Sequence, residues 1–550
     1  MRNYIMASLF ALSLSSAYAQ ELFSERLYTR KDSLRGSVTK ERIWWDLLKY
    51  DLHVAVNPED QSIKGSNTVR YKVVERYNVL QIDLQSPMVI EKVSQDGKLL
   101  EIIQDGFAHF IKLSKDQNPG EINELKIEFS GKPQPAKRAP WDGGFTWSKD
   151  ASGKHFIATS CQGIGASLWW PCKDHMYDEP DNGMAININV PGNLVAVSNG
   201  RLKKEKTEKN KTKTYTWEVV NPINNYGVNI NVGDYVHFSE KYKGEKGILD
   251  MDYWVLRPNL EKAKIHFKDA TRTVEAFEHW FGPYPFYEDS YKLVEVPYLG
   301  MEHQSSVTYG NGYQKGYLGS DLSYTGWGLK WDYIIVHESG HEWFANNITY
   351  KDIADMWVHE GFTMYSESLF VEYFYGKAAG AEYSRGVRFG IENSKPLIGD
   401  YGVNSEGSSD MYNKGNNLLH TLRQIANDDE KWRAALRGLN KEFYHQTITT
   451  KQIEDYMAKS LGLQLDSFFD QYLRDYRIPV FEYWVKDGVL LYHWSNCIDS
   501  FDMPVKIYVN GIEKVLKPTV SPKMEKLETK EASIKVDPDF YVYSFNTMGK

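Results

Sequence analysis

The chain has 550 residues, with 65 basic and 73 acidic side chains and a net charge of −8. This length is too great for one hydrophobic core and predicts a protein of three or four domains. The strand and helix patterns described below predict a multidomain α+β fold. The sequence contains no basic stretch large enough for nucleic-acid binding, no internal repeat and no heptad run, so we expect no nucleic acid among its partners.

Residues 1–19 have the pattern of a secretory signal peptide. Arg2 precedes an apolar stretch from Ile5 to Leu14, and Ala17-Tyr18-Ala19 offers small residues before a cleavage point after Ala19. No cysteine lies near that point, so we expect no lipid anchor. Elsewhere the sequence has no uninterrupted apolar run of about 18 residues, so we expect no transmembrane anchor in the mature chain. We therefore expect an exported protein, periplasmic or secreted, that is soluble after signal-peptide removal.

Short alternating runs separated by turns extend from about residue 50 to 238 and predict an N-terminal β domain over 20–243. Tyr50–Val56 and Met184–Val190 alternate apolar and polar residues at period two. The lysine-rich run from Lys203 to Lys213 lies between such runs, so we interpret it as the solvated tip of a hairpin.

The chain has only three cysteines, Cys161, Cys172 and Cys497. An exported protein of this size with so few is stabilised by its core and not by a disulfide framework. The separation between Cys161 and Cys172 does not decide whether they pair.

Helical patterns dominate from about residue 258 and predict a mainly helical domain over 244–477. Leu260 to Phe281 reads as one amphipathic helix that ends at Gly282-Pro283. A strand from Tyr291 to Pro297 follows, and Gly300-Met301-Glu302 comes directly after it. A glycine at a strand edge lets the backbone approach a substrate closely, which would place the Glu302 carboxylate beside it.

His337-Glu338-Ser339-Gly340-His341 is the most informative segment. On a helix, His337 and His341 share one face, so both imidazoles can bind one metal ion. The preceding residues are strongly apolar, which predicts a buried helix. Burying these polar groups without a partner costs several kcal/mol, and a metal removes that cost. Glu338 points toward the metal without binding it, so we expect it to act as a general base.

Glu360 follows the second histidine after a gap of eighteen residues, in the first turn of a helix predicted from Trp357 to Tyr375. Two imidazoles and one carboxylate suit Zn²⁺ and leave a fourth position for water. Glu367 lies two turns further on the same face, where we expect it to hydrogen-bond a ligand imidazole. We also expect Asn346 to cap the end of the metal-binding helix.

Tyr412 lies in Met411-Tyr412-Asn413-Lys414-Gly415, at the start of a helix predicted near Asp410 to Asn427. A phenol there can face the metal and donate a hydrogen bond to an oxyanion, although Tyr412 is one of 37 tyrosines. Further helices are predicted from Glu430 to Tyr472. After Ile478-Pro479 the alternating pattern returns, at Val480–Val485, Val489–Trp494, Val505–Val509 and Phe540–Phe545, which predicts a small β module over 478–550.

These motifs together make the chain resemble the aminopeptidase N and leukotriene A hydrolase family of zinc metallopeptidases. The match covers residues 40 to 480 in order. It includes the two histidines with Glu338, the gap before Trp357-Val358-His359-Glu360-Gly361, the segment 341–349, Tyr298 to Gln304, Tyr412 to Gly415, and the loop from Ser160-Cys161-Gln162-Gly163 to Trp170-Pro171-Cys172-Lys173-Asp174.

The resemblance implies a fold and a role for each matching residue. The fold is a saddle-like N-terminal β-sheet domain, a thermolysin-like catalytic domain and a β-sandwich-like C-terminal domain. The cofactor is one Zn²⁺ per chain, and the substrates are peptides with a free N-terminus. In the substrate-binding segment Gly300-Met301-Glu302, Gly300 would align the peptide backbone and Glu302 would bind the α-ammonium beside Gln162 and Glu360, while Tyr412 would stabilise the oxyanion.

Several positions depart from the family pattern. His303 replaces the usual asparagine and Leu299 the usual first glycine, which changes the expected pocket for the first residue of the substrate. Gln162 is neutral where many members have glutamate, which would weaken amine binding. Residues 478–550 lack the long helical pattern of better-known members, so we expect a site more open to longer peptides.

Two other functions remain open from the sequence. A thermolysin-like endopeptidase would use the same metal chemistry but would cleave internal bonds of N-acetylated peptides. A non-catalytic zinc-binding interaction protein would not need both Glu338 and Tyr412. The sequence does not predict the preferred N-terminal residue or the oligomeric state.

Overall fold

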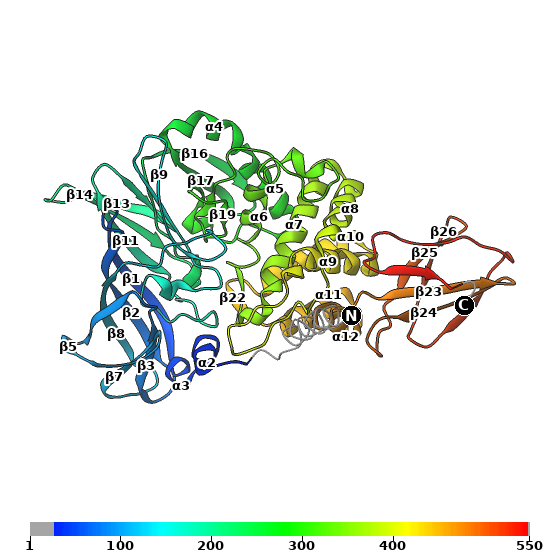
Figure 1. The fold of residues 1–550 in the computed structure, drawn as a ribbon, viewed down its shortest axis with the longest axis horizontal. Coiled ribbons are helices and arrows are strands. Elements are labelled where there is room, and N and C mark those ends of the chain that lie inside the picture. Colours follow the sequence, from blue (N-terminus) through cyan, green and yellow to red (C-terminus); the bar gives the residue numbers. More distant parts are fainter. Residues whose placement is uncertain (1–26, 548–550) are drawn as a thin grey trace, which may run out of the picture.

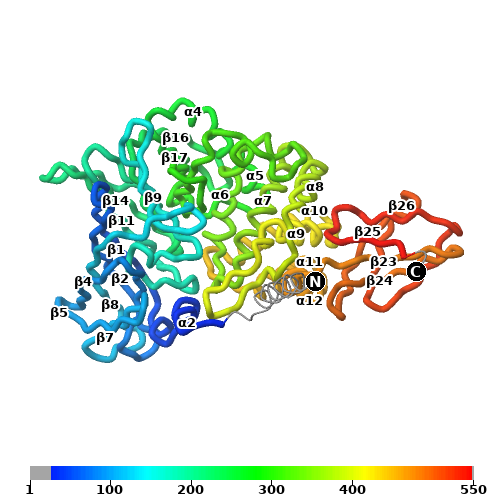
Figure 2. Tube along the Cα trace, in the orientation of Figure 1, coloured from blue at the N-terminus to red at the C-terminus, as the bar shows by residue number. Residues whose placement is uncertain are grey.

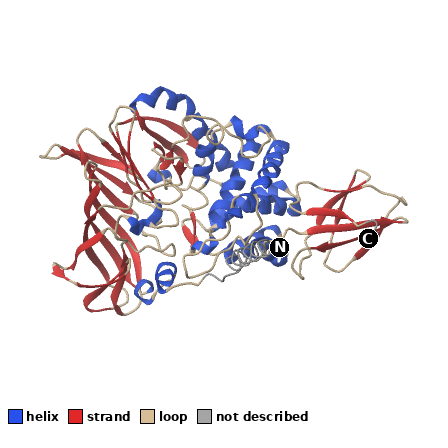
Figure 3. Cartoon of the chain, in the orientation of Figure 1, coloured by secondary structure: helices blue, strands red, loops and turns tan. Residues whose placement is uncertain are grey.

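The computed structural model describes residues 27–547, and the predicted signal peptide lies outside the described residues. Three regions follow one another: a β-rich N-terminal region, a helical middle and a separate β module at the far end (Figure 1). Figure 3 shows the helices gathered between the two β regions. Across residues 27–547, no helix has both the length and the apolar character that a membrane span requires.

Two short helices, α2 (Arg30–Gly36) and α3 (Lys40–Ile43), precede the N-terminal β region. Its main sheet has eight strands, in the order β13 (Arg201–Thr207), β14 (Thr212–Val219), β11 (Met184–Pro191), β1 (Trp45–Asn57), β2 (Ser62–Val73), β8 (Ile122–Gly131), β4 (Val89–Gln95) and β5 (Lys98–Leu99). The alternating patterns expected in β1 and β11 are confirmed as strands with one buried face. The lysine-rich run is exposed, as expected, but most of it forms strand β13, and only residues 208–211 make the tip of the hairpin with β14.

Two smaller sheets complete this region. The first has three strands, in the order β3 (Tyr77–Asp83), β7 (Ala108–Gln117) and β6 (Glu101–Asp105). The second has four, in the order β12 (Val195–Val197), β15 (Asn231–Gly233), β10 (His155–Ser160) and β9 (Gly144–Lys149). Cys161 and Cys172 lie next to them, buried and as free thiols.

The helical middle is built on a mixed five-stranded sheet, in the order β16 (Tyr235–Gly244), β17 (Gly247–Leu256), β18 (Tyr291–Glu295), β20 (Val307–Tyr309) and β19 (Gly300–Met301). A two-stranded pair, β21 (Ile348–Tyr350) and β22 (Gln446–Ile448), lies apart from it. The helices that follow are α4 (Leu260–His266), α5 (Lys268–Phe281), α6 (Tyr333–Gly340), α7 (Trp357–Tyr375), α8 (Lys377–Gly386), α9 (Asn413–Ala426), α10 (Asp429–Glu442), α11 (Thr450–Leu461) and α12 (Asp466–Phe469). The domain boundary expected at 243/244 falls inside the hairpin of β16 and β17 and stays a prediction.

The prediction of a single helix from Leu260 to Phe281 is wrong in one respect, because the helix is interrupted at Phe267 and forms α4 and α5. At this break the Phe267 ring packs against the rings of Tyr253 and Tyr309, with ring centroids 5.6 and 5.0 Å apart. The amphipathic period continues across the break, so the pattern alone reads as one helix. The predicted helix from Trp357 to Tyr375 is confirmed as α7, which is buried from Trp357 to Val371 and therefore lies at the centre of the helical core.

The C-terminal module consists of two facing sheets, β27 (Lys523–Lys526), β24 (Val489–Ser495), β23 (Val480–Lys486) and β29 (Tyr543–Asn546), and β26 (Ile512–Leu516), β25 (Val505–Val509) and β28 (Ile534–Val536). The last strand begins later than expected because Tyr541 attaches to the helical region. Its backbone N–H donates to Thr421 Oγ1 at 2.9 Å, and its carbonyl accepts from Tyr472 at 2.7 Å.

Candidate active site

Two helix ends bring the histidines and Glu360 together. Asp332 caps the start of α6 by accepting a hydrogen bond from the Ile335 backbone at 3.0 Å. The helix ends at Gly340, and His341 is the residue that caps it, with φ −64° and ψ −17°. This backbone is still helical, so the imidazoles of His337 and His341 lie on one face with ring centroids 5.0 Å apart.

Three buried atoms converge on the space beside this face. Nε2 of His337 and Nε2 of His341 lie 3.8 and 3.4 Å from Glu360 Oε2. Glu360 Oε2 is buried without a hydrogen-bond partner, as expected of a metal ligand. All three ligand atoms lie within 4.8 Å of one another. This donor set fits a Zn²⁺ ion.

Hydrogen bonds on the far side of each ring fix its orientation. His337 Nδ1 contacts Glu367 Oε1 at 2.6 Å, and His341 Nδ1 contacts the Phe344 carbonyl at 3.0 Å. Each ring therefore donates from Nδ1 and turns Nε2 toward the metal position. Glu367 accepts a second hydrogen bond from Tyr383 at 2.6 Å. The structure thus brings Glu367 to the ring where the sequence analysis expected it.

Gln162 connects two carboxylates from the opposite side of the pocket. Its Nε2 donates to Glu302 Oε1 at 2.7 Å and to Glu360 Oε1 at 2.9 Å. Carboxylate oxygens only accept hydrogen bonds, so the amide of Gln162 must turn its NH₂ group toward both of them. Its Oε1 is then free to accept a hydrogen bond from an incoming ammonium group. Tyr226 also donates to Glu302 Oε1, at 3.0 Å.

A second set of possible ligands, Glu302, Glu338 and His341, also lies within 4.8 Å. It is a poorer metal site because Glu302 Oε1 already accepts two hydrogen bonds. Asn346, expected to cap the helix, instead donates from Nδ2 to the Glu302 backbone carbonyl at 2.9 Å, because α6 has already ended at Gly340. Asn346 therefore helps to fix the segment that carries Glu302.

Crowded carboxylates shift one another's pKa values in this pocket. Burial, with the charges of Glu302 and Glu360, raises the pKa of Glu338 to about 7. Burial also raises the pKa of Glu302, and the Glu360 charge adds to this effect. Burial acts on Glu360 in the same direction, but the two imidazoles outweigh it and lower the pKa of that carboxyl, which stays ionised.

Tyr412 reaches the pocket through a close contact between α7 and α9. Its ring lies beside His337, with ring centroids 6.2 Å apart. Tyr412 caps the start of α9, and Gly415 of that helix meets Gly361 of α7. A Cβ on Gly415 would lie 2.7 Å from Gly361 Cα. Only glycine permits this approach, which places Tyr412 beside Glu360.

A cavity of about 190 Å³ contains these groups and extends toward β19. Gly300 passes so close to α6 that a Cβ there would lie 2.4 Å from Ile334 Cγ2. Met301 and Leu299 line the cavity, whereas His303 does not. His303 is buried behind β19 with its Nδ1 at 3.3 Å from Thr308 Oγ1. Of the two departures in the segment from Tyr298 to Gln304, only Leu299 therefore lines the pocket.

The sequence analysis missed Tyr226 and Trp141. Tyr226 lies within a short 3₁₀ turn, Asn225–Gly227, with no recognisable motif, and nothing in the sequence points to its hydrogen bond with Glu302. Trp141 is 63% exposed and lines the mouth of the pocket. Its position between Pro140 and the glycine pair at 143–144 predicts a turn, but not which surface the turn meets.

Comparison with known families gives two matches in order along the chain. The Peptidase M1 N-terminal domain matches residues 47–226, and the Peptidase family M1 domain matches residues 265–472. Aminopeptidase M1 of Arabidopsis thaliana is 24% identical over 404 residues, which are 70% of this chain and 44% of the plant protein. Aminopeptidase N of Lactobacillus helveticus is 24% identical over 475 residues, 80% of this chain and 52% of the relative. The chain spans about half the length of these curated relatives.

The fold matches a solved structure over most of both chains. The M1 zinc metallopeptidase from Deinococcus radiodurans superposes with a TM-score of 0.67 at 21% identity, covering 80% of this chain and 95% of that one. A mutant of that peptidase bound to a Tyr-Ser-Ala substrate gives the same TM-score at 20% identity, covering 80% and 96%. The N-terminal β region and the helical middle expected from the sequence therefore have the fold of M1 zinc metallopeptidases, and the C-terminal β module that the sequence also predicted follows them.

Proposed function

Because the chain belongs to the M1 peptidase family, we propose that it is a zinc aminopeptidase that removes single residues from the N-termini of peptides. The observation that carries this proposal is the bridge from Gln162 to Glu302 and Glu360. It sets a carboxylate cluster for a cationic amine directly beside a metal ligand. An internal segment of a peptide carries no ammonium to neutralise that cluster.

Substrate binding follows from the charges in the pocket. The α-ammonium would donate to Glu302 and to Oε1 of Gln162, with the Glu360 carboxylate adding favourable charge. This arrangement holds the first peptide carbonyl over the metal position and leaves the first side chain in the cavity lined by Leu299 and Met301.

A zinc ion bound by His337, His341 and Glu360 would polarise the scissile carbonyl and increase the acidity of water. Glu338 would take the proton of the attacking water and pass it to the leaving amine. With a pKa raised to about 7 by burial and its neighbouring carboxylates, Glu338 suits both steps near neutral pH. Tyr412 would donate a hydrogen bond to the substrate oxygen as negative charge develops there.

The test is a panel of aminoacyl fluorogenic amides and N-acetylated peptides, assayed with the zinc-loaded chain and with a chelator. We expect hydrolysis of free-amine substrates, loss of activity in chelator and recovery with added zinc. We also expect Glu338→Gln to keep zinc and to lose nearly all turnover. Cleavage of N-acetylated peptides at internal bonds would instead identify an endopeptidase.

We also propose that the protein is exported, on the basis of the pattern in residues 1–19. N-terminal sequencing of the protein from fractionated cells should find a mature chain that begins at Gln20. Retention of Met1 in the mature protein would contradict export by this route.

A further inference from the structure

Residues 28–43, which we name the N-terminal brace, connect the two regions that form the pocket. The brace contains α2 and α3 and lies before the part of the chain that matches the family. At one end the Tyr28 hydroxyl donates to Asp400 of the helical region. Gly36 packs so tightly there that a Cβ would lie 2.0 Å from the Asn404 nitrogen. In Figure 2 the brace runs along the edge of the β region toward the helices.

Arg35 of the brace binds the loop that carries Gln162. Its Nη2 donates to the Ile164 carbonyl at 2.7 Å, and its Nη1 donates to Ser167 Oγ at 3.2 Å and forms an ion pair with Asp174. The Arg35 side chain is only 12% exposed. Ile164 lies two residues after Gln162, so Arg35 holds the backbone directly beside the substrate-facing amide.

The loop around Ile164 is a tight turn that fits this guanidinium. Ile164 N donates to the Gln162 carbonyl and Gly165 N to the Cys161 carbonyl, both at 2.8 Å. Gly165 has φ +91°, and a Cβ there would lie 1.5 Å from Arg35 Nη2. Glycine is therefore required for two reasons, its backbone conformation and the space that Arg35 fills.

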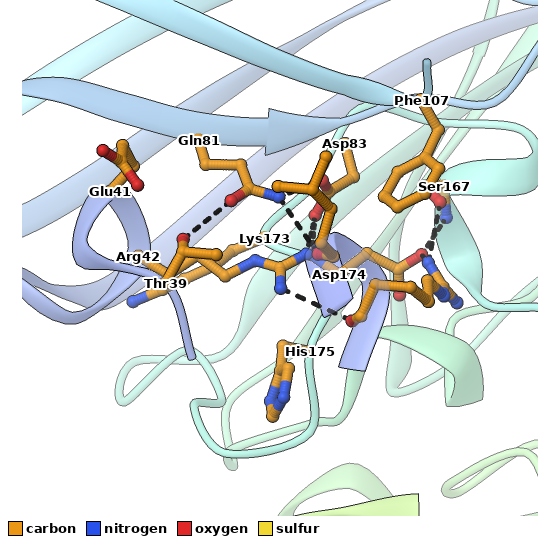
Figure 4. Close-up of polar contacts among 12 residues, drawn as sticks. Thr39, Glu41, Arg42, Gln81, Asp83, Phe107, Ser167, Lys173, Asp174 and His175 are labelled. Carbon is orange, nitrogen blue, oxygen red and sulfur yellow. Dashed lines mark hydrogen bonds and ion pairs between the residues drawn. The ribbon is translucent and has the colours of Figure 1, made fainter. Parts of the chain in front are cut away.

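A second attachment fixes the far end of the same loop. Arg42 of α3 donates to Asp83 at 2.6 Å, and both side chains are fully buried. Asp83 also accepts from the Asp174 backbone at 3.2 Å and from Gln81 at 2.8 Å. Figure 4 shows Asp83, Asp174 and Ser167 as neighbours and Gln81 between Asp83 and Thr39. Removing one partner of such a buried pair is costly, so the brace resists displacement.

We propose that Arg35 is a positioning residue for amine recognition, acting through the turn that carries Gln162. Gln162 belongs to the β region, whereas Glu302 and Glu360 belong to the helical region. One amide can reach both carboxylates, at 2.7 and 2.9 Å, only if the two regions are held in a fixed relation. The brace touches both regions and grips this turn. The role in recognition rests on the proposed aminopeptidase function, whereas the grip on the turn does not.

The grip is tested by hydrogen–deuterium exchange on the full zinc-loaded chain. In Arg35→Met the backbone amides of residues 161–168 should exchange faster than in wild type, and Arg35→Lys, which can keep one donor, should be intermediate. Arg30→Met is the matched control, since Arg30 lies on the same helix but is 73% exposed and pairs with Asp105. Unchanged exchange in both Arg35 variants would refute the proposal that the brace holds this turn.

The recognition role is tested by kinetics with an aminoacyl amide. Arg35→Met should raise KM about tenfold, the effect of losing one hydrogen bond to a charged group, and should leave kcat within about twofold. In a Gln162→Ala background the same change should raise KM no further, because the two residues act in series. Additive effects, or a fall in kcat alone, would overturn the role of Arg35 in recognition. A wild-type chain that cleaves no aminoacyl amide would refute the proposed function. The exchange experiment would still show whether Arg35 holds the turn that carries Gln162.

Discussion

Replacing Gly415 with alanine should lower the rate of the reaction without changing zinc binding. Alanine would put a Cβ 2.7 Å from Gly361 Cα, where ordinary contacts begin at 3.4 Å. The difference requires α9 to move from α7 by about 0.7 Å, because the Cβ is fixed rigidly to the backbone of α9 and Gly361 Cα belongs to the backbone of α7, so neither atom can rotate away. Tyr412 starts α9 and moves with it, whereas the metal ligands lie on α6 and α7.

A misplacement of this size lowers the rate by up to about 10²-fold, because catalytic hydrogen bonds depend steeply on geometry. We expect Gly415→Ala to lose about that factor in kcat, with zinc content unchanged by metal analysis. Gly361→Ala is the matched control. Its Cβ would lie 3.2 Å from Gly415 Cα, a shortfall of only about 0.2 Å, so its loss should be much smaller.

Combining Gly415→Ala with Tyr412→Phe tests the cause. If the shift acts through the phenol, the double variant should be little slower than Tyr412→Phe alone. A folded, zinc-loaded Gly415→Ala protein with wild-type kcat would refute the reasoning, and so would parallel loss of zinc and activity.

Three further changes test other parts of the structure. Glu367→Gln should weaken zinc binding by about 10–100-fold in a chelator competition, because it weakens the support of His337; unchanged affinity would argue against that support. Glu302→Gln should weaken inhibition by an amino-acid hydroxamate by about 10–100-fold but leave its des-amino analogue unaffected, and equal losses would contradict amine binding. Burial raises the pKa of Glu179 to about 8, and its Oε1 is buried without a hydrogen-bond partner. A raised carboxyl pKa favours the folded state below about pH 4.5, and this contribution is lost as pH rises toward 8. Glu179→Gln should therefore gain melting temperature over wild type at pH 8 but not at pH 5, and an equal difference at both would refute the assignment.

Local patterns predicted much of the fold. The strands β1 and β11 and the helix α7 were found where expected. The period-two pattern of the two strands reflects their one buried face, and the apolar run of α7 reflects a helix that is buried on all sides. The break at Phe267 was not predicted, because the aromatic rings that Phe267 packs against come from strands of another segment.

The sequence by itself determined which residues can form the metal site. Two histidines at i and i+4 share a face by helix geometry alone, and Glu360 lies in the first turn of the buried helix α7. Only the tertiary structure decided what surrounds them. Gln162 and Tyr226 are separated from Glu302 by long stretches of chain, and their hydrogen bonds to it depend on how the β region packs against the helical region. The contact of Arg35 with the loop beside Gln162 depends in turn on how the N-terminal brace packs against the β region. A periodic pattern records which face of an element is buried, whereas a hydrogen bond between distant side chains depends on the relative position of whole elements.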